Sequence, residues 1–213
     1  MTHTVNVDTV AGQLADSYKQ WVFGAEKRRP LMPQHAFKEG SDRNYNLKGT
    51  EPRKFLQWEE QDFGINLGWT DDASPSTGVR VSRWFAARPG GATAQVKYGE
   101  PIALGYGKSP SFIRYENRTF GINLGWSKTP VFEWRLLGGV TGRPVECGDR
   151  LAIHNAKAGS ADVPGVLIHF DRTVGGDIGW PDSQSWWDQV KDKLPGIAKD
   201  ALTALIMAKL RGG

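Results

Sequence analysis

The sequence predicts an all-β protein made of three repeats, each with four short strands. A heptapeptide carries the repeat: FGINLGW at residues 63–69 returns unchanged at 120–126 and in a diverged form at 174–180. The tryptophans that end these copies are 126 − 69 = 57 and 180 − 126 = 54 positions apart. A fixed period of this length indicates a structural unit used several times. The 26 glycines, 12 prolines and 9 tryptophans of the 213 residues are typical of turns and aromatic-rich strands.

Other strand-like segments accompany each heptapeptide. Apolar pentamers precede it at 55–59, 112–116 and 167–171, and tryptophan-bearing segments follow it at 83–85, 133–135 and 185–187. Glycine-led strands lie further upstream at 96–104 and 145–153, with a poorer first version that opens at 37–40. Alternation with period 2 predicts that Phe63, Ile65, Leu67 and Trp69 share one face of a strand.

Twelve short strands in three four-strand units over residues 37–190 resemble the β-trefoil superfold. That resemblance implies a pseudo-threefold, six-stranded barrel capped by three hairpins, with the apolar strand positions filling the barrel and the cap. No single family is identified by it. Ricin-B-type lectins carry a Gln-x-Trp motif in each repeat, and here only Gln184-Ser185-Trp186 fits.

Helices are expected at both ends of the chain. Val10, Leu14, Tyr18, Trp21 and Val22 follow helical spacing, which predicts an amphipathic helix over 9–23 that Asp8 or Thr9 caps. A second helix is expected over 197–210, begun by Pro195 and Gly196 and ended by Gly212 and Gly213. The expected domains are an N-terminal helical extension at 1–36, a trefoil at 37–190 and a C-terminal helix at 191–213.

The helix over 197–210 is apolar around most of its circumference, since only Lys199, Asp200, Thr203 and Lys209 are polar. Such a helix must be buried against something, and the helix over 9–23 is its expected partner. Docking to another subunit or a carrier protein, or membrane insertion, is the alternative. At about 21 Å it is too short to cross a bilayer. The residues that would make these contacts are Ile197, Leu202, Leu205, Ile206 and Leu210.

The sequence does not predict an enzyme, a cofactor or a metal site. It lacks nucleophile-elbow, zinc-protease, phosphate-loop and dinucleotide motifs. Its four histidines have no ligand spacing, and the lone Cys147 cannot form an internal disulfide. The net charge of 27 − 23 = +4 is spread among acids, so no nucleic-acid partner is expected. The N-terminus lacks a secretory pattern, so cytoplasmic synthesis without a Sec signal is expected, with non-classical release left open.

Two polar positions recur with the period and are the candidate ligand-binding residues. An acid closes each pentamer (Glu59, Glu116 and Asp171), and an amide or acid lies inside each heptapeptide (Asn66, Asn123 and Asp177). The two are close across a predicted hairpin, where carboxylate and amide groups beside an aromatic ring would suit a sugar. The structural alternative is that the Asn residues shape a tight hairpin and the acids cap turn amides. Trp69, Trp126 and Trp180 are expected to pack in the core.

These observations predict a non-enzymatic recognition module that binds glycans through pseudo-threefold surface sites. One alternative is a structural or cargo protein that assembles or docks through the C-terminal helix. Another is a toxin-like protein whose helix perturbs a membrane. The third repeat, which has Asp177 in place of asparagine, is expected to be either a degenerate site or the only working one.

Overall fold

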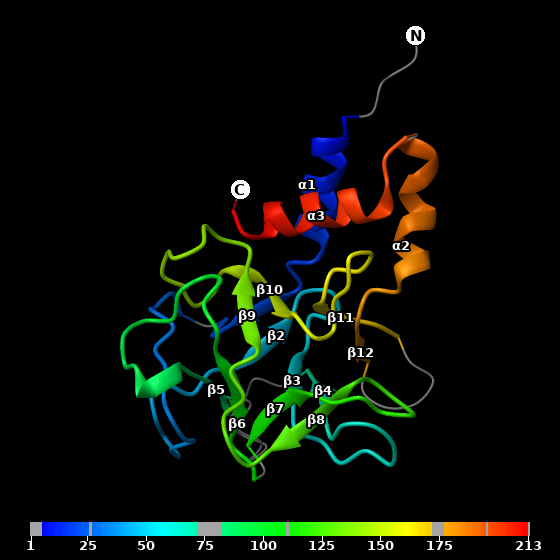
Figure 1. Ribbon diagram of the computed structural model, residues 1–213. Coiled ribbons are helices and arrows are strands. Elements are labelled where there is room, and N and C mark those ends of the chain that lie inside the picture. The colour runs from blue at the N-terminus through cyan, green and yellow to red at the C-terminus, as the bar shows by residue number, and fades with distance from the viewer. Residues whose placement is uncertain are drawn as a thin grey trace.

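The computed structural model describes residues 6–25, 27–71, 82–109, 111–171, 177–194 and 196–212. Val174, Gly175 and Gly176 of the third heptapeptide and Pro195 and Gly213 of the C-terminal helix prediction lie outside the described residues. Within these ranges the chain forms twelve strands and three α-helices. The helices gather on one side of the β-structure (Figure 1). The predicted predominance of β-structure and the number of strands are therefore confirmed.

Six strands follow one another around a ring. They are β1 (Trp21–Phe23), β2 (Leu47–Gly49), β5 (Trp84–Ala87), β6 (Ala103–Tyr106), β9 (Trp134–Leu137) and β10 (Arg150–Asn155). Strand β1 pairs with β2 and β10, β5 with β6, and β9 with β10, all antiparallel. Single bridges join Tyr45, just before β2, to Trp84 of β5, and Ile102, just before β6, to Trp134 of β9. The pairings thus return to β1.

The other six strands form three hairpins, each attached to one strand of the ring. The hairpins are β3 (Phe55–Gln57) with β4 (Gly68–Thr70), β7 (Phe112–Tyr115) with β8 (Leu124–Ser127), and β11 (Val166–His169) with β12 (Ile178–Gly179). Strand β3 pairs with β2, β7 with β6, and β11 with β10. The ring and the hairpins share one buried apolar core.

Three buried tryptophans tie the ring to the hairpins in the same way. Trp21, Trp84 and Trp134 begin β1, β5 and β9. Their indole Nε1 atoms donate to the carbonyl oxygens of Leu167 (2.6 Å), Leu56 (2.7 Å) and Ile113 (2.8 Å), respectively. A buried indole N–H needs an acceptor, so each hairpin strand supplies one.

One strand of the ring comes from the N-terminal part of the chain, which the sequence did not indicate. The expected segment at 185–187 lies instead in helix α2 (Ser183–Val190), which is followed by the 3-10 turn η3 (Lys191–Lys193). The strand beside β10 is β1: Trp21 pairs with Leu151 of β10 and makes the third tryptophan contact. The tryptophan in the sequence does not by itself identify this strand, because the pairing of β1 with β10 depends on contacts between segments far apart in the chain.

The expected helix over 9–23 is therefore wrong in its second half. Helix α1 (Val7–Ser17) is capped by Asn6, whose side chain accepts from the backbone N–H of Asp8 (2.9 Å), rather than by Asp8 or Thr9. Residues 21–23, Trp-Val-Phe, are strand formers and belong to the ring. A short apolar run at helical spacing looks the same for a longer helix as for a helix followed by a strand.

The heptapeptide is a hairpin tip followed by a strand, rather than one continuous strand. Gly64 and Gly121 adopt positive φ (89° and 82°), which turns the chain just after each phenylalanine. Phe63 and Phe120 are consequently exposed, by 64% and 79%. Ile65 and Leu67 are buried as expected, but the prediction that Phe63 shares their face is wrong.

Three segments meet at another point of the core through a cyclic set of backbone hydrogen bonds. The N–H of Leu31 donates to Val145 (3.0 Å), that of Val145 to Val96 (2.8 Å), and that of Val96 back to Leu31 (2.9 Å). All three side chains are fully buried. Each segment thus supplies one donor and one acceptor to the same triangle.

The 3-10 turn η2 (Pro89–Gly91) lies in the connection between β5 and β6.

A second apolar core joins the helices to the outer face of the ring. Helix α3 (Lys199–Leu210) packs on α1, and Lys209 forms an ion pair with Asp8 (2.8 Å). The buried members of this core come from α1, α2, α3 and strands β9, β10 and β11. The positions of α3 that face solvent include Ala201, Ala204 and Ala208. No helix among the described residues is long and apolar enough to span a bilayer.

Candidate functional site

The two asparagines of the heptapeptides close their own hairpin loops. The side-chain Oδ1 of Asn66 accepts from the backbone N–H of Gln61 (3.2 Å), and that of Asn123 accepts from Arg118 (3.0 Å). Both bonds reach five residues back along the chain. The repeated asparagine therefore has a structural role in these two units, and its amide oxygen is already engaged.

Glu59 and Glu116 lie over glycines of the neighbouring strand. A Cβ atom added at Gly68 or Gly125 would collide with the Glu59 or Glu116 carboxylate, respectively. Glu116 also accepts from the guanidinium of Arg114. Gly68 and Gly125 thus make room for the acids that close the first two pentamers. In the first two hairpins, the predicted amide and the predicted acid therefore make separate local contacts.

The third pentamer is offset by one residue from the sequence alignment. Gly68 is opposite Gln57 and Gly125 is opposite Arg114, whereas Gly179 is opposite Ile168. Phe170 therefore occupies the position of Glu59 and Glu116, and Asp171 comes one residue later. His169 correspondingly replaces Trp58 and Tyr115.

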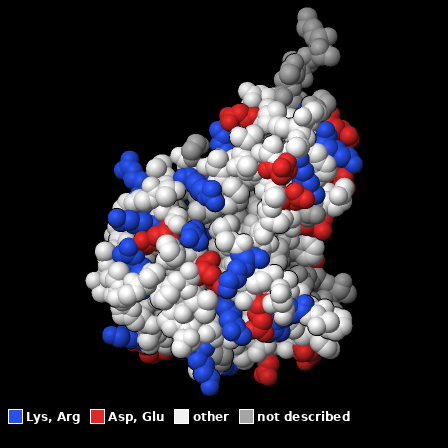
Figure 2. Space-filling view, viewed as in Figure 1, with Lys and Arg blue, Asp and Glu red and all other residues white. Residues whose placement is uncertain are grey.

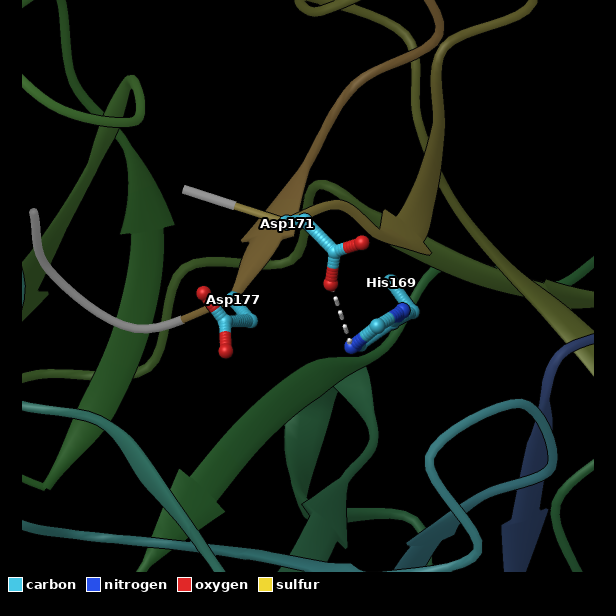
Figure 3. A group of neighbouring side chains, drawn as sticks. All are labelled: His169, Asp171 and Asp177. Atoms are coloured by element: carbon cyan, nitrogen blue, oxygen red, sulfur yellow. Dashed lines mark ion pairs between the residues drawn. The ribbon is translucent and has the colours of Figure 1, made fainter. Parts of the chain in front are cut away.

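The third hairpin brings Asp171 and Asp177 together with His169 (Figure 3). One potential ligand atom from each residue lies within 4.8 Å of those of the other two. His169 ends β11, Asp171 follows two residues later, and Asp177 directly precedes β12. The backbone N–H of Phe170 donates to the carbonyl of Asp177 (3.2 Å), which holds the two arms of the hairpin together at this point.

His169 is positioned from two sides, and Asp171 is open to solvent. The backbone N–H of His169 donates to Gln20 Oε1 (2.9 Å). The His169 ring packs edge-on against the Trp69 ring, with the ring centroids 5.9 Å apart. His169 Nε2 lies 3.7 Å from Asp171 Oδ1, and the Asp171 side chain is 96% exposed. The cluster can therefore offer acceptors to a polar ligand. Its three potential ligand atoms could also coordinate a divalent cation whose remaining ligands are water molecules.

The predicted contact residues of the C-terminal helix are occupied within the chain. Leu202, Ile206 and Leu210 are fully buried, and Ile197 and Leu205 are half-buried against the same core. The small alanines on the outer face explain how a helix of such apolar composition faces solvent.

On the side seen in Figure 2, basic and acidic residues are interspersed.

A buried histidine outside the predicted site was missed by the sequence analysis. His154 of β10 is 8% exposed and lies directly opposite Arg135 of β9. Burial, together with the charges of Arg211 and Arg135, lowers its pKa to about 4. The only signal in the sequence was a histidine in the β10 strand pattern, and nothing there indicates that two arginines approach it.

Acid is expected to destabilise the protein through His154. The unfolded histidine takes up a proton near its ordinary pKa of 6.5, and the folded one only near 4. The contribution of His154 to the free energy of unfolding is therefore fully present above pH 6.5. It falls by roughly 3 kcal/mol as the pH is lowered to 4. Urea unfolding at pH 7 and pH 4.5 measures this loss. The His154→Gln variant should lose less stability than the wild type over the same interval; an equal loss in both would show that other groups are responsible.

Comparisons of this chain with protein-family models, with curated proteins and with solved structures found no match.

Proposed function

We propose that this chain is a β-trefoil recognition protein that binds a glycan through its third hairpin. Three repeated arrangements support the fold assignment: the ring of six strands, the three tryptophan-to-carbonyl bonds and the Leu31–Val96–Val145 triangle. In this arrangement β1 is the closing strand of the third unit, so the three units are related by a pseudo-threefold axis.

The observation that carries the binding proposal is the difference between the three hairpins. Asn66 and Asn123 spend their amide oxygens on loop closure, and Glu116 is paired with Arg114. In the third hairpin two carboxylates and an imidazole converge instead. Neighbouring sugar hydroxyls donate well to such acceptors. Phe170, 43% exposed between His169 and Asp171, adds apolar surface beside the cluster.

The proposed activity is binding without catalysis. Burial raises the pKa of the Cys147 thiol to about 11, so this group is protonated at neutral pH and is a poor nucleophile. His154, whose pKa is lowered to about 4, lies outside the third hairpin. A recognition role requires only that the ligand's hydroxyls donate to acceptor atoms of the third hairpin, such as the exposed Asp171 carboxylate.

A glycan array with the full chain tests the proposal. The double variant Asp171→Asn and Asp177→Asn is expected to lose binding to the wild-type ligand at least tenfold, because hydrogen bonds to charged acceptors contribute about 1.5–3 kcal/mol. The single variant Asp171→Asn should leave the unfolding midpoint almost unchanged, since the Asp171 side chain is 96% exposed. Glu59→Gln, the matched change in the first hairpin, should retain binding.

Two results would count against this function. Equal binding by the double variant and the wild type would place the ligand elsewhere. Loss of binding in EDTA, restored by Ca²⁺ or Zn²⁺, would mean that the cluster acts through a bound ion and does not contact hydroxyls directly.

A further inference from the structure

A cavity of about 380 Å³ lies beside the C-terminal end of α3, apart from the third-hairpin cluster. Its lining includes Arg135, Leu137, Thr141, His154 and Arg211. In Figure 1 the red end of α3 lies over the yellow-green loop that follows β9. The backbone N–H of Gly138 donates to Leu210 (2.7 Å) in this region. The walls thus come from the ring and from the last turn of the helix.

The polar groups around the cavity are basic. His154 and Arg135 are cross-strand neighbours on β10 and β9, and such side chains lie close together. Arg211 comes from the turn that ends α3. Among the described residues that line the cavity, none is acidic. The positive charges of Arg135 and Arg211 disfavour a further positive charge on the His154 ring. An anion in the cavity would offset the charge of the two guanidinium groups.

The donors of these groups are largely unused within the described part of the chain. Arg135 Nε donates to the carbonyl of Gly99 (3.1 Å), which fixes the guanidinium and leaves four of its five N–H groups. The guanidinium of Arg211 makes no hydrogen bond or ion pair with the residues described. The Nδ1 atom of His154 is buried and has no hydrogen-bond partner in the described structure. An unpartnered buried nitrogen is costly, because it has lost its hydrogen bonds to water.

The carbonyl groups at the end of α3 do not oppose an anion here. The last carbonyls of a helix carry partial negative charge. The carbonyl of Arg211 accepts from both the backbone N–H (3.1 Å) and the hydroxyl (3.0 Å) of Thr141, and the carbonyl of Leu210 accepts from Gly138. These acceptors are already satisfied, so the arginines dominate the field in the cavity.

We propose that this cavity binds the phosphate group of a small phosphorylated molecule through Arg135, Arg211 and His154. Two guanidinium groups match the charge of a phosphate dianion, which they can bind in a bidentate manner, whereas a single carboxylate leaves one positive charge uncompensated. The volume lies within the range of small-molecule sites, about 300–1,000 Å³. It leaves room beside the phosphate, along Leu137 and Ala156, for the rest of the ligand.

Titration of the full chain with inorganic phosphate, followed by NMR of the His154 ring, tests the proposal. Sodium acetate and sodium chloride at equal ionic strength are the comparison anions. Phosphate is expected to shift the His154 resonances in a saturable way and to raise the pH midpoint of its titration, because an anion beside Arg135 and Arg211 favours the charged imidazole. Acetate is expected to bind at least tenfold more weakly than phosphate, and chloride to give no saturable shift.

Variants separate a site from general charge attraction. Arg211→Ala, at the exposed end of α3, should weaken phosphate binding at least tenfold and keep the circular dichroism of the wild type. Arg143→Ala removes the same charge from the exposed turn nearby and should change binding less than twofold. Equal effects of the two variants, acetate binding as tight as phosphate, or no saturable shift would each overturn the proposal. Asp171→Asn does not alter this lining, so the glycan and phosphate proposals can fail separately.

Discussion

Replacing Trp21 with alanine is expected to destabilise the protein by about 3–5 kcal/mol, a large fraction of the stability of an ordinary domain. Trp21 is fully buried, stacks on Trp69 with ring centroids 5.8 Å apart, and donates to Leu167. Its loss opens a cavity in the main core and leaves the Leu167 carbonyl without its donor. Urea unfolding followed by circular dichroism measures the cost.

Trp187 provides the control, because the sequence placed this residue in the segment expected to close the third unit. It is half-buried in α2, and Trp187→Ala should cost less than about 2 kcal/mol. Trp84→Ala and Trp134→Ala should each cost about as much as Trp21→Ala, since the three indoles make the same bond. If Trp21→Ala were no more harmful than Trp187→Ala, β1 would not be part of the ring in solution.

The second large effect is expected from a charge placed in the helical core. Ile206 is fully buried between α3 and the rest of its cluster. Ile206→Asp would bury an unpaired carboxylate and should cost about 4 kcal/mol or more, enough to unfold much of the protein at 25 °C. Ala204→Asp adds the same charge on the exposed face of the helix and should cost less than about 1 kcal/mol. Urea unfolding of both variants, with light scattering for mass, measures the difference.

This comparison also tests the alternative that the C-terminal helix serves assembly. If the wild-type protein were an oligomer and Ile206→Asp a folded monomer, α3 would be an interface between chains. An unfolded Ile206→Asp beside a folded Ala204→Asp instead shows that α3 belongs to the core of its own chain, as its contacts with α1 indicate.

Much of the local structure could be predicted from the sequence. The repeated heptapeptide and pentamer identified strands and turns, because apolar alternation and glycine placement act within a few residues. The apolar stretch that ends the chain predicted a helix, found as α3 at Lys199–Leu210. Phe63 was misplaced for an equally local reason, since the sequence pattern does not reveal the positive φ of Gly64.

The candidate site was predicted only in part. All six repeated polar residues were identified, and the structure brings Asp171 and Asp177 together but gives Asn66 and Asn123 structural bonds. His169 was not predicted as a member of the cluster, because the histidines show no ligand spacing in the sequence, and the third pentamer was aligned one residue out of register. A one-residue shift exchanges the side chains on the two faces of a strand, and only the pairing of Gly179 with Ile168 reveals it.

The sequence by itself determined the predominance of β-structure, the repeated heptapeptide and the number of strands, because these depend on side-chain patterns within each segment. Only the tertiary structure decided that β1 lies between β2 and β10, that one hairpin of three gathers carboxylates, and that His154, Arg135 and Arg211 line one cavity. The bond from Trp21 to Leu167 joins residues 146 positions apart. Such contacts are selected by the burial and hydrogen bonding of the whole chain, which no local pattern encodes.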